Sequence, residues 1–460
     1  MLIRSILNAC KYCGDKVAII DGHSGQSLTY KTLAINIKAS ANYLKFNKIS
    51  IVISVGEPSL DDLGLCLSIG LFDGTWIPLA DSEQITYVLR NLEGGSKVLI
   101  LDSTSGTKDL QQSDHSRKSD LNSTPFLITF SSGTTGHPKG VLLDQVTKLH
   151  RSQQTIDLFA VGPRDILLSS SPVHHSLGQR HLFVSLLAKG TLVRNVPFTT
   201  EGWLFCAKKY NPTFAIPVST QVKLLEKKNP EFEHSLHSFR ALVMSSAPCS
   251  SNLKRFLMQH KIDLWETYGC TETAFASAVK LTSSDNLENV GSPLSQVNIL
   301  VDEQTSEIKV KTPYLCQGYL GQNSVYKACF DEYGFFKTGD RGAWLGKFLQ
   351  FEGRLGLEFT VAGNRVNPLA IERQFPGLPG VGSIVAVPIP NTIFDHTVGF
   401  FFVNDDKYQT TAHDSKKKLF AWAVLNLQKH EIPTQFISIN AWPLLPNGKL
   451  DRQKLIQSIR

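Results

Sequence analysis

The stretch "FSSGTTGHPKG" (residues 130–140) contains three glycines, four hydroxyl side chains and one lysine. The apolar residues 126–129, which precede it, predict a buried strand. A glycine-rich loop with hydroxyls, exposed backbone N–H groups and a cation at its far end forms an anion-binding concavity, and phosphate is its usual ligand. The Gly-Lys-Ser/Thr of a Walker A loop occurs nowhere in the chain. The loop therefore indicates phosphate chemistry of another kind.

Composition narrows the class of protein. A chain of 460 residues exceeds what one hydrophobic core supports, so we expect at least two domains. The 42% hydrophobic and 19% charged residues are typical of a soluble globular protein. The net charge of +7 is small for this length, and its one notable run, Lys416-Lys417-Lys418, favours a solvated helix face over a nucleic-acid patch.

Targeting signals are not predicted. No stretch reaches the roughly 18 apolar residues of a membrane span, and the N-terminus is too weakly apolar for a signal peptide. The eight cysteines are scattered, and we interpret the Cys10/Cys13 pair as structural because no second C-x-x-C accompanies it. These features predict a reduced, cytoplasmic protein.

Short apolar runs alternate with helical patterns up to about residue 270. A helix follows Thr29, the expected N-cap, with Leu33, Ile37, Ala41 and Leu44 at helical spacing. We interpret residues 103–123 as a surface linker. Alternating strands and helices predict parallel sheets covered on both faces. The expected strands are residues 51–55, 97–101, 126–130, 166–170, 191–194, 241–245 and 263–265.

The pattern changes after about residue 290. Short strands are expected at residues 297–301, 307–311, 335–338, 343–345 and 348–351, which predicts an antiparallel or barrel-like section. A smaller α+β pattern follows, with strands near 383–388 and 397–403 and a helix near 415–429. The fold class is thus α/β, with a large domain of residues 1–354 and a small α+β domain of residues 355–460.

Further motifs match one family in order along the chain. They are "ETYGCTET" (266–273), "KTGDRG" (337–342), "GRLGLEFTVAGNRVNPLAIE" (353–372) and "PNGKLDR" (446–452). Together with the glycine loop, the sequence resembles the adenylate-forming superfamily, which comprises acyl-CoA synthetases, adenylation domains of peptide synthetases and luciferases.

The resemblance implies an ATP site. The glycine loop is expected to bind the β- and γ-phosphates through Ser131, Ser132, Gly133, Thr134, Thr135, Gly136 and Lys139. Ser246, Ala247, Pro248 and Gly269 are expected beside the nucleotide. Tyr268 would stack on adenine, while Asp340 and Arg354 would hold the ribose. Thr271 would contact the α-phosphate, Glu272 would bind Mg²⁺, whose preferred ligands are oxygens, and Lys449 would bridge the α-phosphate and the attacking carboxylate.

"SPVHHSLGQRH" (171–181) corresponds to the family's acid-binding region. His175 matches a histidine of many acyl-CoA synthetases, and His174 takes the usual aromatic position. The aspartate that pairs with an α-amine in amino-acid-activating domains is absent from this segment. Arg180 and His181 raise two readings: recognition of a second anionic group on the acid, or a structural role for Arg180.

The chain departs from the family pattern at several places. Gly356 replaces the usual hinge Asp or Lys, Thr360 replaces a common lysine, and Ser245-Ser246 replaces Gly-Gly. Glycine can still absorb a large backbone rotation, so a hinge remains physically reasonable.

These features predict an ATP-dependent acid–thiol ligase that forms acyl-AMP from a small carboxylic acid, with CoA as the favoured acceptor and an aryl or other non-amino acid as substrate. One alternative is a stand-alone adenylation enzyme that loads the phosphopantetheine of a carrier protein. Another is a non-catalytic nucleotide-binding scaffold, which retention of Lys139, Glu272 and Lys449 disfavours.

Overall fold

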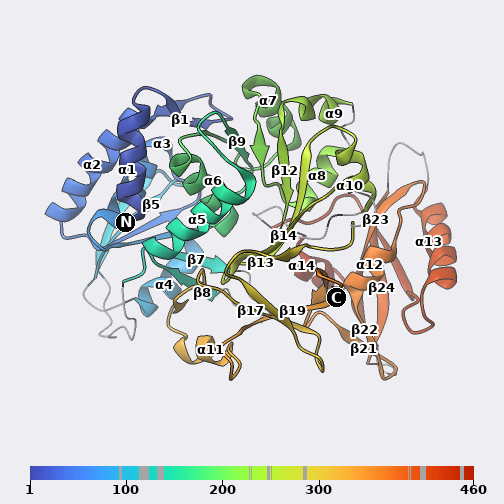
Figure 1. Cartoon of the computed structure of the whole chain (residues 1–460). Coiled ribbons are helices and arrows are strands. Elements are labelled where there is room, and N and C mark those ends of the chain that lie inside the picture. The colour runs from blue at the N-terminus through green and yellow to red at the C-terminus, as the bar shows by residue number, and fades with distance from the viewer. Residues whose placement is uncertain are drawn as a thin grey trace.

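The computed structural model describes residues 1–92, 96–112, 124–131, 139–226, 228, 230–245, 249, 251–282, 287–391, 393, 395–404, 411–445 and 450–459. Its secondary structure forms four sheets. In Figure 1 the N-terminal segment, in blue, lies on the left, and the C-terminal segment, in orange and red, lies on the right. None of the described helices combines the length and apolar character needed to cross a membrane.

The largest sheet has nine strands in the order β15-β14-β13-β12-β11-β9-β10-β1-β2. The neighbours from β1 through β10, β9, β11 and β12 to β13 pair in parallel, while the two ends of the sheet are antiparallel. Its strands are β1 (Val17–Asp21), β2 (Ser27–Thr29), β9 (Ile166–Ser169), β10 (Thr191–Arg194), β11 (Phe214–Ala215), β12 (Ala241–Met244), β13 (Asp263–Cys270), β14 (Ala274–Lys280) and β15 (Ser292–Pro293).

A seven-stranded sheet has the order β18-β8-β7-β4-β3-β5-β6. The pairs β7–β4, β4–β3 and β3–β5 are parallel, and β18, β8 and β6 pair antiparallel to their neighbours. Its strands are β3 (Ile51–Val55), β4 (Thr75–Leu79), β5 (Lys97–Asp102), β6 (Thr107–Gln112), β7 (Leu127–Ser131), β8 (Lys139–Leu143) and β18 (Gly318–Tyr319).

Both faces of the seven-stranded sheet are buried, as a mostly parallel sheet requires. Successive side chains of a strand point to opposite faces. Accordingly, Val52 of β3 belongs to one apolar cluster, which also includes Trp76 and Leu127, while Ile51 and Ile53 belong to another. The first cluster also contains Leu167, Leu192 and Leu182, so it joins the two large sheets into one core.

Helices cover these sheets. The described α-helices are α1 (Leu2–Cys13), α2 (Tyr30–Phe46), α3 (Leu60–Ser68), α4 (Ile85–Asn91), α5 (Gln145–Phe159), α6 (Ser176–Leu187), α7 (Thr200–Tyr210), α8 (Ser219–Glu226), α9 (Glu231–Ser235), α10 (Ser251–Met258), α11 (Asn323–Ala328), α12 (Pro368–Gln374), α13 (Ala412–Asn426) and α14 (Arg452–Gln457). Short 3₁₀ turns occupy Ile69–Leu71, Ser82–Gln84 and Leu236–Ser238. The expected cap of α2 is confirmed, because the Thr29 side chain accepts a hydrogen bond from the Thr32 N–H.

The antiparallel section is a four-stranded sheet in the order β16-β17-β19-β20. Its strands are β16 (Asn298–Val301), β17 (Glu307–Lys311), β19 (Phe336–Leu345) and β20 (Phe348–Arg354). The prediction of separate strands at 335–338 and 343–345 was wrong, because β19 runs through both. Its register shift between Arg341 and Gly342 marks a bulge that bends the strand without ending it.

The C-terminal residues form a five-stranded sheet with the path β22-β21-β24-β23, and β25 pairs with β24. Its strands are β21 (Phe359–Val361), β22 (Asn364–Val366), β23 (Val381–Asn391), β24 (Asp395–Asn404) and β25 (Gln435–Ile439). Two apolar clusters draw only on residues from Phe359 onward. The domain boundary at Arg354 stays a prediction, and these separate clusters are compatible with it.

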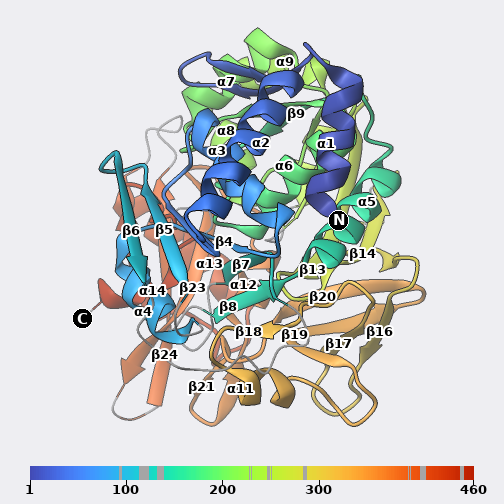
Figure 2. The same ribbon diagram turned by 90° about the vertical axis from the view of Figure 1, so that its left-hand side faces the viewer.

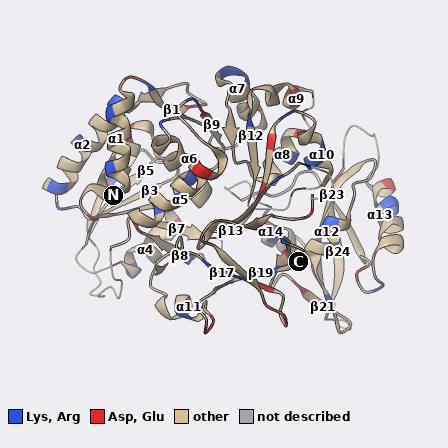
Figure 3. Ribbon diagram, in the orientation of Figure 1, with Lys and Arg blue, Asp and Glu red and all other residues tan. Residues whose placement is uncertain are grey.

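Two surface expectations have different outcomes. Lys416 and Lys417 are exposed on α13, so this run forms the expected solvated helix face (Figure 3). The linker interpretation of 103–123 was wrong for its first half, because β6 pairs with β5 along its whole length. Alternation in "TKDLQQ" is weak, and an edge strand needs little apolar content. The second half of that range lies largely outside the described residues.

Candidate active site

The glycine loop joins two neighbouring antiparallel strands, β7 and β8. Its two ends, Ser131 and Lys139, are direct cross-strand partners and are both half-buried. The next residue, Gly140, lies in a tight space, since a Cβ there would be 3.0 Å from Leu320 Cβ and 3.2 Å from the Ile128 side chain. The loop residues Ser132, Gly133, Thr134, Thr135 and Gly136 lie outside the described residues, so their predicted phosphate contacts stay predictions.

Three predicted nucleoside ligands lie together. The Tyr268 hydroxyl on β13 donates to Asp340 Oδ2 on β19 at 3.0 Å and lies 3.1 Å from Thr338 Oγ1. Arg354 on β20 is the cross-strand partner of Asp340, with its Nε 3.6 Å from Asp340 Oδ1. Burial, reinforced by the Asp340 carboxylate, raises the pKa of Tyr268 well above its usual range. Tyr268 is therefore a neutral hydrogen-bond donor to a buried carboxylate.

Gly269 follows Tyr268 at a register shift in β13. A Cβ there would lie 1.9 Å from the carbonyl oxygen of Ala274, so only glycine fits this position. The close approach folds β13 back into β14 and leaves Thr271 and Glu272 in the turn between them. The predicted roles of Thr271 and Glu272 toward the α-phosphate and the metal stay predictions.

The backbone of that turn is held by Arg151 of α5, a residue that the sequence reasoning missed. Its Nη1 donates to the Thr271 carbonyl at 2.8 Å and its Nη2 to the Glu272 carbonyl at 2.6 Å. The same guanidinium donates to the Tyr314 carbonyl from Nε at 2.8 Å and from Nη2 at 2.6 Å. Arg151 is buried. A guanidinium presents its donors in a fixed planar fork, which suits several carbonyls at once.

The Glu272 side chain has its own partner. Its Oε1 accepts a hydrogen bond of 2.9 Å from the hydroxyl of Tyr319 on β18. The ammonium of Lys139 lies 5.1 Å from the centroid of the Tyr319 ring. Strand β18 lies beside β8, as Figure 2 shows, and Tyr319 pairs there with Val141. Tyr319 thus contacts both the predicted phosphate cation and the predicted metal ligand.

The residues predicted to bind the nucleoside lie next to those predicted to bind the phosphates and the metal. Cys270, the last residue of β13, lies between Tyr268 and Glu272 in the sequence, and burial, with the carboxylates of Glu272 and Asp340, raises the pKa of its thiol. Within the described part of the chain, no group of three or more His, Cys, Asp and Glu side chains could hold a metal ion. Mg²⁺ is commonly held by one or two carboxylates together with substrate phosphates, so a single Glu272 fits that ion.

The predicted acid-binding histidines lie just before α6. The rings of His174 and His175 are in contact, with centroids 4.3 Å apart. His174 is buried, and among the described residues neither of its ring nitrogens has a hydrogen-bond partner. Burial lowers the pKa of His174 to about 4, so its imidazole is neutral at pH 7. An unpartnered neutral imidazole can hydrogen-bond to a ligand.

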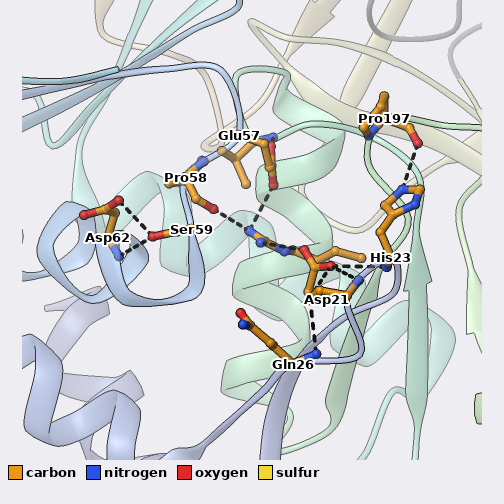
Figure 4. A network of polar contacts seen from close by, with 11 residues as sticks. Asp21, His23, Gln26, Glu57, Pro58, Ser59, Asp62 and Pro197 are labelled. Atoms are coloured by element: carbon orange, nitrogen blue, oxygen red, sulfur yellow. Dashed lines mark hydrogen bonds and ion pairs between the residues drawn. The ribbon is translucent and has the colours of Figure 1, made fainter. Parts of the chain in front are cut away.

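Glu57, which no motif marked, fixes the position of this segment. Its Oε2 accepts the Val173 N–H at 2.9 Å, one residue before His174. Arg194 Nη1 lies 3.2 Å from Glu57 Oε1, and Arg194 Nη2 lies 3.6 Å from Asp21 Oδ2. Figure 4 shows Glu57 and Asp21 within this network. Burial raises the pKa of Glu57, and Arg194 opposes that shift. The network links the seven-stranded sheet to the end of β10 in the nine-stranded sheet.

Arg180 and His181 have partners within the protein. The Arg180 guanidinium lies 3.8 Å from the Phe275 ring centroid, and its Nη1 donates to Thr155 Oγ1 at 2.7 Å. His181 Nδ1 donates to the Leu177 carbonyl at 3.0 Å, and its Nε2 accepts the Ile216 N–H at 3.2 Å. These contacts explain His181 as a structural residue. They agree with the structural reading of Arg180, while its role toward an acid stays a prediction.

Four predicted site residues, Lys449, Ser246, Ala247 and Pro248, lie outside the described residues. Their neighbours are described. Leu444 and Leu450, which flank the predicted catalytic lysine, form a β-bridge, and Arg452 forms an ion pair with Glu372 at 2.5 Å. The described residues on either side of 446–449 therefore pair with each other, and Arg452 connects them to α12 and, through the Ala386 carbonyl, to β23.

Comparison with known proteins gives a family for this arrangement. The model of the AMP-binding enzyme family matches residues 66–320, which is more than half of the chain. This chain belongs to the AMP-binding enzyme family. The match covers the glycine loop, the Tyr268–Glu272 motif and Tyr319, so the family resemblance drawn from the sequence is confirmed.

Relatives within this family differ in their acceptors. The chain is 24% identical over 492 residues to 4-coumarate--CoA ligase-like 9 of Arabidopsis thaliana, covering 95% of this chain and 86% of that protein. It is 26% identical over 379 residues to the D-alanine--D-alanyl carrier protein ligase of Bacillus cytotoxicus, covering 75% and 72%. A match to bacitracin synthase 3 of Bacillus licheniformis, 22% identical, covers 96% of this chain and 7% of that protein.

Similarity to solved structures confirms the fold class. ATP-bound MatB from Rhodopseudomonas palustris superposes with a TM-score of 0.83 at 22% identity, covering 100% of this chain and 99% of that chain. The o-succinylbenzoate CoA synthetase MenE from Bacillus subtilis, in complex with its acyl-adenylate intermediate, gives a TM-score of 0.78 at 19% identity, covering 98% and 97%.

Proposed function

We propose that this protein is an acid–CoA ligase that works through an acyl-adenylate. In the first step, a carboxylate oxygen attacks the α-phosphorus of ATP, the bond to the α,β-bridging oxygen breaks, and pyrophosphate leaves. In the second step, the sulfur of a thiol attacks the acyl carbon, the bond to the AMP oxygen breaks, and the thiol proton passes to solvent.

One observation carries the proposal. Side chains with complementary roles toward a nucleotide meet around the turn between β13 and β14: a buried Tyr268–Asp340 pair on one side and the Lys139, Tyr319 and Glu272 set on the other. These groups come from different strands and from widely separated parts of the sequence. A non-catalytic core would not need a lysine and a glutamate held by a shared tyrosine without an ion pair between them.

The chain's own groups have distinct tasks in the first step. Lys139 would offset negative charge on the β- and γ-phosphates, and Asp340 would accept hydrogen bonds from the ribose hydroxyls. Glu272 would hold Mg²⁺, which supplies charge neutralisation on the phosphate oxygens when bound. Thr271 would contact the α-phosphate and Lys449 would bring the two anionic reactants together. Such preplaced charges are the main source of catalysis in phosphoryl and related transfers.

The surroundings of α5 and α6 favour an acid without an α-amine. Three basic side chains, Lys148, Arg151 and Arg180, lie together, and burial, followed by the charges of Arg151 and Arg180, lowers the pKa of Lys148 well below its usual value. Among the described residues, none of the three forms an ion pair with an Asp or Glu. Gln179 connects Lys148 to the Val173 carbonyl, next to His174. An ammonium substrate would meet like charge there, whereas an aryl or other non-amino acid would not.

The second step requires the C-terminal residues to move. We propose residues 355–460 as a separate domain that turns about Gly356, where φ is +84° and a Cβ would have nothing within 4 Å. Asn367 and Arg373 donate to the Glu352 carbonyl and so tether the C-terminal side to β20. Rotation would break these contacts at low cost, since both partners can bind water instead.

Carrier-protein loading is the second candidate. The similarity to a D-alanyl carrier protein ligase and to bacitracin synthase 3 favours it. The two functions share the first step and differ in the thiol, which is free CoA in one and the phosphopantetheine of a carrier protein in the other.

ATP–pyrophosphate exchange over a panel of aryl, fatty, dicarboxylic and amino acids tests the proposal. We expect exchange with a non-amino acid, followed by CoA consumption and thioester formation when CoA is added. Exchange restricted to amino acids would refute the substrate class, and carrier loading without CoA consumption would select the second candidate. Absence of exchange with every acid would favour a nucleotide-binding scaffold.

A further inference from the structure

Tyr319 occupies an unusual position between two opposite charges. Its hydroxyl bonds to Glu272 Oε1 at 2.9 Å, and its ring lies under the Lys139 ammonium at 5.1 Å. Lys139 and Glu272 form no ion pair with each other, although both contact the same side chain. A direct Lys139–Glu272 ion pair would occupy the groups that must bind phosphate and metal.

The hydroxyl contact restricts Glu272 without neutralising it. A tyrosine hydroxyl donates to one carboxylate oxygen, so the carboxylate stays ionised and its other oxygen stays available to a cation. The Glu272 backbone is meanwhile held by Arg151 and by the Cys316 N–H, which donates to the same carbonyl at 2.9 Å. Glu272 is therefore fixed at both its backbone and its side chain. Groups that hydrogen-bond to a metal-binding carboxylate, without touching the metal themselves, orient that carboxylate.

The ring contact acts on Lys139 in a similar way. An ammonium over an aromatic face is attracted weakly compared with an ammonium bonded to phosphate. Lys139 can therefore leave the ring for a phosphate group, while the ring limits its other orientations beforehand. Tyr319 itself is buried and its ring packs edge-on against Tyr326 at 5.3 Å, so it does not move freely.

We propose that Tyr319 is a positioning residue that presents Glu272 to Mg²⁺ through its hydroxyl and Lys139 to phosphate through its ring. The inference rests on the proposed function of the site as an ATP site. It separates two effects of one side chain: Tyr319→Phe tests the hydroxyl, and the comparison of Tyr319→Leu with Tyr319→Phe tests the ring.

Calorimetric titration of the full-length protein with α,β-methylene-ATP, with and without Mg²⁺, measures both effects independently of turnover. Tyr319→Phe removes the hydroxyl and keeps the ring. We expect it to weaken the apparent Mg²⁺ affinity of the nucleotide complex by about 10- to 100-fold and to leave Mg²⁺-free nucleotide binding unchanged. Tyr319→Leu removes both contacts and should weaken binding under both conditions.

Tyr326→Phe is the matched control. Its hydroxyl bonds to the Cys316 carbonyl, and its ring touches that of Tyr319 without contacting Glu272. It should retain wild-type Mg²⁺ dependence. Thermal melting identifies variants that unfold. If Tyr319→Leu does not fold, the comparison of Tyr319→Phe with Tyr326→Phe still decides the metal effect.

Wild-type Mg²⁺ dependence in a folded Tyr319→Phe variant, or equal losses in Tyr319→Phe and Tyr326→Phe, would overturn the inference. So would a Tyr319→Phe variant that loses Mg²⁺-free nucleotide binding as strongly as Tyr319→Leu. Failure of the proposed function looks different: the wild type would bind the nucleotide with Mg²⁺ dependence and yet show no acid-dependent pyrophosphate exchange.

Discussion

Replacing Arg151 by methionine tests how the catalytic turn is held. Methionine has similar length and no donors, so the Thr271 and Tyr314 carbonyls would lose the partner that Arg151 gives them, while Glu272 keeps the Cys316 N–H. A buried carbonyl without a donor costs about 1–3 kcal/mol, so two of them cost about 2–6 kcal/mol. Because methionine, unlike arginine, buries no charge, we expect the lower end, about 2 kcal/mol.

Hydrogen exchange measured by mass spectrometry reports this loss locally. The Cys316 N–H bonds to the Glu272 carbonyl, so peptides containing Cys316 monitor the turn directly. A loss of about 2 kcal/mol corresponds to roughly 30-fold faster exchange. Arg151→Lys, which keeps the charge and loses the planar fork, should show an intermediate rate.

The same Arg151→Met variant should catalyse pyrophosphate exchange more slowly and require more Mg²⁺ for it, because the Glu272 backbone is less restricted. Unchanged hydrogen exchange at the Cys316 N–H, together with unchanged Mg²⁺ dependence of pyrophosphate exchange, would refute the view that Arg151 holds this turn. Faster hydrogen exchange spread evenly over all four sheets would instead indicate a general loss of stability, which also contradicts a local role of Arg151 at this turn.

Three further predictions concern other parts of the site. Asp340→Asn should raise the KM for ATP by about 10- to 100-fold, the effect of losing one charged hydrogen-bond acceptor, with kcat less affected; an unchanged KM would contradict the ribose assignment. Lys449→Ala should reduce adenylation by about 10²- to 10³-fold and spare thioester formation from supplied acyl-adenylate, and equal losses in both half-reactions would count against a withdrawing lysine. Burial lowers the pKa of His181 to about 4, so only the unfolded chain takes up a proton between about pH 6.5 and 4. The free energy of unfolding should therefore fall over that range by on the order of 3 kcal/mol, and by less in His181→Gln. An equal fall of the melting temperature with pH in both proteins would argue against this.

Much of the fold followed from sequence because local signals agreed with tertiary structure. The strands β3, β10 and β17 occupy the expected residues, since short apolar or alternating runs bounded by turn residues have few other conformations. β13 extends five residues beyond its expected end at Trp265, up to Cys270. The motif there is polar, and pairing with β14 rather than apolar pattern maintains the strand.

The site residues that were predicted are likewise those that a local sequence motif marks. Tyr268 and Asp340 were named from motifs, and the structure brings them into contact. Arg151, Tyr319 and Glu57 escaped prediction because each acts through a contact with a residue more than 40 positions away in the sequence. No local spacing encodes such a contact, and a buried arginine on a helix has the same sequence pattern as an exposed one.

The two-residue strand β18 has a practical consequence for fragments of this chain. Gly318 and Tyr319 cover the outer side of β8, whose Val141 and Leu142 would otherwise face solvent with unpaired backbone groups. A truncated protein that stops before Tyr319 would expose the apolar edge of β8. Because a strand of a second molecule can pair with such an edge, the truncated protein should self-associate. Expression of the N-terminal part alone should therefore extend past Leu320.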